Sequence, residues 1–157
     1  MSEEATKLAD KLLSEGERTL VFFRALTAHD WARHVYADGA HWTVRQAFEH
    51  LALSERSMLR LCEGLLAGGK GAPEDFDIDR FNREHTDRMG ASPIAELLDI
   101  FSGTRQATAV FARGLDDAQL AMRGRHPAMG DSSLGDILKM IYLHNTMHVR
   151  DIKKLLA

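Results

Sequence analysis

The sequence predicts an all-α protein, a four-helix bundle in which residues 1–157 form a single domain. Apolar residues recur at three- and four-residue spacings through four long stretches, as they do on the buried face of an amphipathic helix. No useful length of chain alternates apolar and polar residues, so we assign no β-sheet. A length of 157 residues with 45% hydrophobic side chains is ordinary for one globular domain.

Capping residues set the expected ends of the helices. Thr43 and Gln46 form a capping box at the start of the second helix, and Ser133 starts a similar box at the fourth. Ser92 before Pro93 places a capping hydroxyl ahead of a proline at the first position of the third helix. The expected helices cover about residues 3–27, 43–67, 93–113 and 134–157.

Two connections in this bundle are long, residues 28–42 and 68–92. The second contains the segment 77–82, which can open a short extra helix that runs through Met89. Long ordered connections in a small bundle are usually functional or serve as crossovers between distant helices. We therefore expect each of the two connections to be functional or to serve as a crossover.

Composition excludes several classes of function. The net charge is −3, and the 20 basic residues are scattered rather than clustered, so nothing favours binding to a nucleic acid. No apolar run approaches the roughly 20 residues that span a bilayer, and the acidic start of the chain is unlike a signal peptide. The lone Cys62 cannot form an intramolecular disulfide. We expect a soluble, cytoplasmic protein without a membrane partner.

Three of the eight histidines have the spacing of metal ligands. His144 and His148 lie four residues apart, which places both imidazoles on nearly one face of the last helix. His148 lies within the apolar stripe of that helix, and His144 lies at its edge. His50 lies about 60° from the centre of the apolar stripe of the second helix, so it can face the same interior.

Three neutral imidazoles with an open position are typical of a catalytic zinc site, and nickel or ferrous iron would suit the same ligands. Such an ion lowers the pKa of a bound thiol or water and so makes a nucleophile available near neutral pH. The alternative is that an ordinary pair of histidines is solvated or hydrogen-bonded without a metal.

The segments 42–51 (WTVRQAFEHL), 79–82 (DRFN) and 143–152 (LHNTMHVRDI) resemble, in this order and spacing, the DinB/YfiT-like metalloenzyme superfamily. The resemblance covers nearly the whole chain. It implies a mirror variant of the up-and-down four-helix bundle, frequently a dimer, with a divalent metal held by His50, His144 and His148. Some members of the superfamily are mycothiol-dependent maleylpyruvate isomerases or S-transferases that use bacillithiol or glutathione.

We therefore expect a divalent-metal-dependent enzyme of the thiol S-transferase or isomerase type, with a low-molecular-weight thiol as cosubstrate and a small-molecule substrate. Cys62 lies on or near an apolar stripe and is expected to be a small core residue rather than the nucleophile. Arg80, Asn82 and His126 are candidates for binding polar groups of the substrate. We also expect a homodimer, in which an apolar patch left on the first or third helix is buried. The alternative function is a noncatalytic bundle that stores or senses metal, or a stress-linked binding module.

Overall fold

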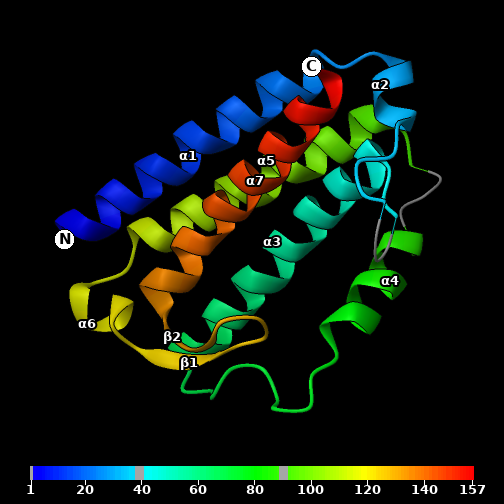
Figure 1. The fold of residues 1–157 in the computed structure, drawn as a ribbon. Coiled ribbons are helices and arrows are strands. Elements are labelled where there is room, and N and C mark those ends of the chain that lie inside the picture. The colour runs from blue at the N-terminus through cyan, green and yellow to red at the C-terminus, as the bar shows by residue number, and fades with distance from the viewer. Residues whose placement is uncertain (1, 38–40, 89–91) are drawn as a thin grey trace.

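The computed structural model describes residues 2–37, 41–88 and 92–157, with the side chains of residues 85–88 left outside the description (Figure 1). Within these residues four long helices form the expected bundle. None of the described helices is both long and apolar enough to cross a membrane. The four long helices are α1 (Glu3–Arg24), α3 (Val44–Leu66), α5 (Ile94–Arg113) and α7 (Leu134–Leu156).

Helix α1 stops at Arg24, ahead of the expected end near Thr27. Thr27 instead caps a short separate helix, α2 (Ala28–Ala32). Its hydroxyl accepts from the backbone N–H of Asp30 at 3.1 Å, and the Asp30 carboxylate accepts from the N–H of Thr27 at 2.9 Å. This capping box starts α2, and the extended backbone of Thr27 separates it from α1.

The capping box at the start of α3 is confirmed. The Thr43 hydroxyl accepts from the N–H of Gln46 at 3.2 Å, and the Gln46 amide oxygen accepts from the N–H of Thr43 at 3.0 Å. Ser133 accepts from the N–H of Asp136 at the start of α7. The expected cap at Ser92 is wrong: Pro93 is the N-cap of α5 and no side chain caps it. The carbonyl of Ser92 accepts instead from the Arg45 guanidinium.

Each long helix packs against two others. Both α1 and α3 lie against α5 and α7, so α1 and α3, which are successive in sequence, occupy diagonal corners of the bundle. In Figure 1, α1 and α7 run in one direction and α3 and α5 in the other. The connections from α1 to α3 and from α5 to α7 are therefore crossovers. The segment between α3 and α5 joins neighbouring helices that run in the same direction, so it must carry the chain back along the length of the bundle.

That segment contains the expected short helix, α4 (Ile78–Arg88), which lies beside α3 in Figure 1. The helix is confirmed as far as Arg88, and its expected end at Met89 lies outside the described residues. The connection between α5 and α7 holds another short helix, α6 (Asp117–Leu120).

The expectation of no β-structure is wrong. Strands β1 (Arg123–His126) and β2 (Gly130–Ser133) form an antiparallel hairpin in which His126 lies opposite Gly130. The segment after α3 also pairs with β1, because Gly71 forms a bridge with Arg125. Gly71 has φ 93, and a Cβ atom there would lie 2.4 Å from the backbone nitrogen of Arg125. Only glycine permits this close contact.

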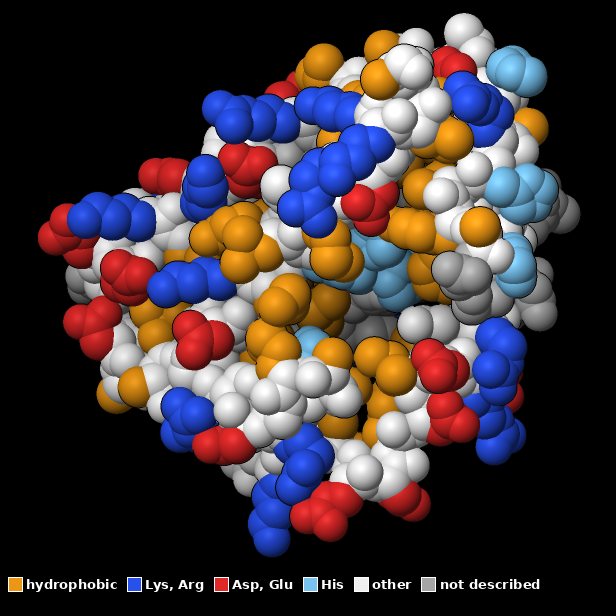
Figure 2. All heavy atoms as spheres, in the orientation of Figure 1, with side chains coloured by type: hydrophobic (Ala, Val, Ile, Leu, Met, Phe, Trp, Pro, Cys, Tyr) orange, Lys and Arg blue, Asp and Glu red, His pale blue; other side chains and the backbone are white. Residues whose placement is uncertain are grey.

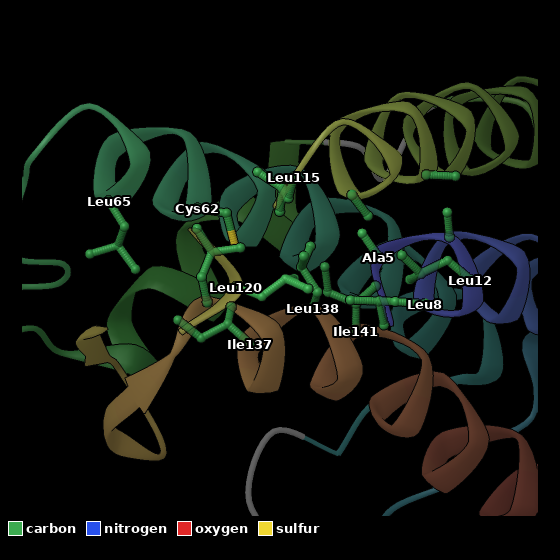
Figure 3. Packing of buried hydrophobic residues seen from close by; sticks show 14 residues of the cluster. Ala5, Leu8, Leu12, Cys62, Leu65, Leu115, Leu120, Ile137, Leu138 and Ile141 are labelled. Carbon is green, nitrogen blue, oxygen red and sulfur yellow. The ribbon is translucent and has the colours of Figure 1, made fainter. Parts of the chain in front are cut away.

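The core of the bundle consists of two apolar clusters. One, shown in Figure 3, packs leucines and isoleucines of α1, α3 and α7 with Cys62 and with two leucines of the connection between α5 and α7. The other packs Phe23, Trp31, Phe48 and Phe101 near α2. Burial of this apolar surface is the main stabilising contribution to a bundle of this kind.

A buried polar layer lies between the two clusters. The Arg105 guanidinium on α5 donates to both carboxylate oxygens of Glu55 on α3, at 2.8 and 3.1 Å. It also donates to the carbonyl of Leu12 on α1 at 3.0 Å and to the side-chain oxygen of Asn145 on α7. Gly16 leaves space for this side chain, since a Cβ atom there would lie 2.8 Å from Arg105 Cγ. One arginine thus links all four long helices.

Candidate metal centre

The three histidines selected by their spacing converge on one point. His50 lies near the start of α3, and His144 and His148 lie near the middle of α7, on the face that packs against α3. The Nε2 atom of His144 lies 3.1 Å from that of His50 and 3.0 Å from that of His148. One ligand atom from each histidine lies within 4.8 Å of the others. The predicted convergence is confirmed.

The outer nitrogen of His148 is held by a tyrosine. The Tyr36 hydroxyl lies 2.7 Å from Nδ1 of His148 and donates its hydrogen to the Asp151 carboxylate at 2.8 Å. Since the single tyrosine hydrogen goes to Asp151, the hydrogen in the contact with His148 belongs to Nδ1 of the imidazole. Burial, and then the hydrogen bond to Asp151, raise the pKa of Tyr36, which keeps its hydroxyl protonated. Nε2 of His148 is left with a free lone pair.

His50 has a similar partner. Its Nδ1 atom lies 3.1 Å from the hydroxyl of Ser54, one turn along α3. A hydrogen on Nδ1 directed to this hydroxyl leaves the lone pair of His50 on Nε2, which faces His144. The ring of Trp42 packs beside His50 with centroids 4.6 Å apart.

This arrangement fits a cation better than it fits hydrogen bonds among the rings. Nε2 of His144 faces Nε2 of both other rings, and whether it carries a hydrogen or a lone pair it can form an ideal hydrogen bond with only one of them. A divalent ion would accept all three lone pairs. Two nitrogens bound to a metal at about 2.0–2.1 Å with a tetrahedral angle lie about 3.4 Å apart. The observed separations of 3.1 and 3.0 Å are close to this value.

The three rings are neutral at neutral pH. Burial, and then the nearby His144 and His148, lower the pKa of His50 to about 3. Burial and the proximity of His148 lower the pKa of His144 to about 4. Burial also lowers the pKa of His148, against the opposing effect of Asp151. Neutral imidazole is the form that binds a metal, so the ligands need not lose protons first.

The connection between α2 and α3 positions the outer groups of the site. The N–H of Val35 donates to the carbonyl of Trp42 at 2.9 Å, and the N–H of Val44 donates to the carbonyl of Arg33 at 2.8 Å. These bonds fold the connection back on itself. Tyr36 and Trp42 are thereby brought to the two outer histidines. The connection between α1 and α3 is therefore a crossover that also contributes two residues to the surroundings of the three histidines.

A cavity of about 590 Å³ opens beside His50 and His144. It lies between α3, α7, α4 and the β-hairpin, and Figure 2 shows histidine side chains in a hollow surrounded by hydrophobic ones. Ser54, Ser57 and Asn82 add polar groups to the wall. Its apolar wall includes Met58, Leu61, Phe76, Phe81, Met129 and Met140.

The other candidate residues have different positions. Asn82 and His126 line the cavity. The Arg80 side chain is exposed, pairs with Glu84 at 3.0 Å and is not part of the cavity wall. Cys62 is buried in the apolar core, where burial raises the pKa of its thiol to about 12. The thiol is therefore protonated and inaccessible, as expected for a small core residue.

Sequence reasoning missed Tyr36 and Asp151 as partners of His148. Asp151 lies within a segment that resembles the superfamily and three positions after His148, so its position on the same helix face was a usable signal. Tyr36 lies 112 residues from His148 in sequence, and no spacing rule connects the two.

Together, the fold and the site define a four-helix bundle with a three-histidine candidate metal centre. The chain belongs to the DinB superfamily, whose family model matches residues 11–152. Its fold is similar to that of YfiT from Bacillus subtilis, described as a probable metal-dependent hydrolase with an unusual four-helix bundle topology. That match has a TM-score of 0.79 at 22% identity and covers 99% of this chain and 87% of the YfiT chain. A comparison with curated proteins gave no match.

Proposed function

We propose that the protein is a divalent-metal-dependent enzyme that joins a low-molecular-weight thiol to an apolar electrophile. The observation that carries this proposal is the opening of the three-histidine centre onto a cavity of about 590 Å³. A site that only stores or senses metal has no need of an adjoining apolar cavity large enough for a small molecule. Zinc, nickel and ferrous iron all suit the three imidazoles.

A bound ion would supply a lowered pKa for a thiol or a water molecule beside it. The protein's residues perform the remaining tasks. Tyr36 and Ser54 contact the outer nitrogens of His148 and His50 and hold these two rings with Nε2 toward His144. The apolar cavity wall holds the electrophile and excludes water from it.

The thiol is proposed to come from a cosubstrate, because Cys62 is buried and protonated. In the transfer, the cosubstrate sulfur forms a bond to an electrophilic carbon of the substrate. In a substitution, the leaving group departs with its electron pair and the thiol proton passes to solvent. In an addition, the π pair of the attacked double bond shifts onto the conjugated group, which then takes up a proton from solvent in place of the one that the thiol released. Asn82 lines the cavity and is a candidate to contact polar substrate groups.

A metal-dependent hydrolase is the second candidate, favoured by the description of the similar YfiT structure. The same site would then act on water instead of a thiol. The two candidates differ in one requirement, the thiol, and this makes them separable in a single assay.

The test begins with protein purified without a metal-affinity resin, whose metal content is measured by elemental analysis. Chlorodinitrobenzene is then offered with glutathione, cysteine or coenzyme A, with and without added zinc, nickel or ferrous iron. Metal-dependent formation of a thioether product supports the transferase. An ester offered without thiol tests the hydrolase. Tight metal binding without turnover of either substrate would contradict both enzymatic candidates and favour a noncatalytic metal-binding bundle.

Variants separate the metal site from the scaffold. His148→Ala removes a ligand, and metal affinity is expected to fall steeply. Met147→Ala, on the adjacent and exposed position of α7, is the matched control and should leave affinity unchanged. Equal affinity in the two variants would contradict the assignment of His148 as a ligand.

We also propose a homodimer. Val21 on α1 and Val110 on α5 are 58% and 74% exposed, so apolar side chains remain on the outer faces of the first and third long helices. Association about a two-fold axis would bury them. Light scattering at micromolar concentration should give twice the monomer mass of 17.6 kDa, and a monomeric mass would contradict this proposal.

A further inference from the structure

His126, the last residue of β1, has one ring nitrogen fixed by the backbone. Its Nδ1 atom accepts hydrogen bonds from the N–H groups of Ala128 and Met129, each at 3.0 Å. An atom that accepts two N–H groups cannot itself carry a hydrogen. The ring is therefore neutral, with its hydrogen on Nε2.

The hairpin enforces this state. Gly130 has φ 71, a left-handed conformation that glycine adopts without strain, and it lies opposite His126 in the register. The loop of residues 127–129 can then turn two successive N–H groups toward Nδ1. Burial also lowers the pKa of His126, which opposes protonation of the ring.

The other ring nitrogen, Nε2, has no hydrogen-bond acceptor within the part of the chain that the structure describes. This nitrogen is also not one of the fully buried side-chain atoms that lack a hydrogen-bond partner, so it retains some contact with solvent. Since the side chain is only 6% exposed and lines the cavity beside His144, the cavity is where Nε2–H can meet an acceptor. A donor in an apolar site stabilises a ligand that supplies an acceptor and costs free energy when none is present.

The cavity wall around this donor is mainly apolar, with Phe76, Phe81, Met129 and Met140 among its residues. We propose that His126 is a substrate-positioning residue whose Nε2–H donates to a carbonyl-type oxygen of a mainly apolar small molecule bound between α4 and the three histidines. This inference rests on the proposed function in taking the cavity as the substrate pocket.

A neutral N–H donor in this place has a chemical consequence. When a nucleophile attacks a carbon conjugated to a carbonyl group, negative charge builds up on the carbonyl oxygen. A positioned donor stabilises that charge without having to reorganise. The inference therefore points to carbonyl-bearing electrophiles in particular as the substrate class.

The binding test uses two naphthalenes of nearly the same shape, 2-acetylnaphthalene and 2-isopropenylnaphthalene, with metal-free protein. They differ in having C=O in place of C=CH₂. We expect the ketone to bind about 3–10 times more tightly to the unmodified protein, the effect of one net hydrogen bond. Equal affinities, or tighter binding of the hydrocarbon, would overturn the proposal.

Two variants identify the donor. In His126→Asn the side-chain oxygen can still accept from the N–H groups of Ala128 and Met129, but the donor at Nε2 is lost. The preference for the ketone should disappear while affinity for the hydrocarbon is retained. In His126→Gln an amide N–H returns near the Nε2 position, and part of the preference should return. An undiminished preference in His126→Asn would assign the hydrogen bond to another residue and refute the proposal.

A measurement on the unmodified protein does not depend on variant folding. Long-range proton–nitrogen NMR spectra of ¹⁵N-labelled metal-free protein at neutral pH report which ring nitrogen carries hydrogen. For His126 we expect a pyrrole-like Nε2 and a pyridine-like Nδ1, and the reverse pattern or a charged ring would overturn the proposal. Because these measurements need no metal, they can succeed even if the proposed metal-dependent activity fails, and the reverse also holds.

Discussion

Tyr36 makes the candidate metal centre depend on a residue outside the bundle. Its hydroxyl bridges Nδ1 of His148 and the Asp151 carboxylate, at 2.7 and 2.8 Å. A carboxylate acting through a hydroxyl holds the ring in one orientation and makes Nε2 a better electron donor. The candidate ligand His148 is thus oriented by a residue of the connection between α2 and α3.

Tyr36→Phe removes this hydroxyl and leaves the ring. We expect metal affinity to fall about 10–100-fold, the usual effect of losing a partner of a metal-bound histidine. Competition with a chromophoric chelator measures the affinity. Tyr142→Phe is the control, because Tyr142 packs against the apolar core of α7 and is remote from Asp151. Equal affinities in the two variants would show that the hydroxyl does not support the ligand.

The pKa values of the three histidines predict the acid sensitivity of the metal-free protein. His50 has a pKa of about 3 in the folded protein, against about 6.5 in an unfolded chain. Between these values the unfolded chain binds more protons, so acid favours unfolding. The stability contributed by the neutral ring is complete above about pH 6.5 and is lost progressively as the pH falls toward the folded pKa.

Urea unfolding of metal-free protein at several pH values between about 7 and 5 checks this expectation. The free energy of unfolding should fall with decreasing pH by up to about 1.4 kcal/mol per unit for each such histidine. His144→Gln should make the dependence shallower, since the pKa of His144 is lowered to about 4 by burial and by His148. A free energy that stays constant over this range would contradict neutral, buried imidazoles.

The sequence was sufficient to predict that the three histidines converge, but not to predict the residues that support them. His144 and His148 are four apart on one helix, and His50 follows a capping box that sets the phase of α3, so local rules place all three on inward faces. Tyr36 reaches His148 only because the crossover folds back between Arg33 and Val44. That fold depends on tertiary contacts, which leave no periodic signal.

The β-hairpin is an element that the strand propensity of its residues does not predict. The strands read Arg-Gly-Arg-His and Gly-Asp-Ser-Ser, without β-branched or aromatic residues. Close packing explains their pairing better, because a Cβ atom at Gly124 would lie 2.1 Å from Leu65 on α3. The hairpin is thus formed against the end of the bundle, whereas the long helices follow from their own apolar periodicity.

Gly71→Ala tests the attachment of the α3–α4 segment to this hairpin. The added methyl would lie 2.4 Å from the backbone nitrogen of Arg125, at a residue with φ 93. The left-handed conformation alone costs about 1–2 kcal/mol, and the backbone contact adds to this. Thermal or urea unfolding should show the loss. The neighbouring Ala72 lines the cavity, so affinity for 2-acetylnaphthalene should also decrease.

Gly103→Ala is the matched control within α5. A methyl group there meets no atom within 4 Å, and alanine favours a helix over glycine by about 1 kcal/mol. This variant should be as stable as the unmodified protein or more so. Similar destabilisation by both substitutions would show that the close approach of Gly71 to Arg125 has no special importance.

At the scale of the whole molecule, the buried polar layer between the two apolar clusters specifies how the helices align. Arg105 contacts Leu12, Glu55 and Asn145, one from each of the other long helices. Asn145 follows His144 directly on α7, so we expect the contact with Arg105 also to position the candidate metal centre along the bundle axis. In the sequence, Arg105 and Glu55 look like ordinary surface charges, because burial of a charge is rare.

Arg105→Met should destabilise the protein by about 3–5 kcal/mol, because it leaves the Glu55 carboxylate buried without its cation. Replacing both members, Arg105→Met with Glu55→Leu, removes the uncompensated charge and should recover much of the loss. Urea unfolding of the two variants measures the difference. A double variant no more stable than the single one would show that packing around Arg105, rather than the charge on Glu55, accounts for the cost. In both variants Asn145 loses the hydrogen-bond donor that holds α7 in position along the bundle axis. We therefore expect metal affinity to be lower than in the unmodified protein in the double variant as well, even where stability is recovered.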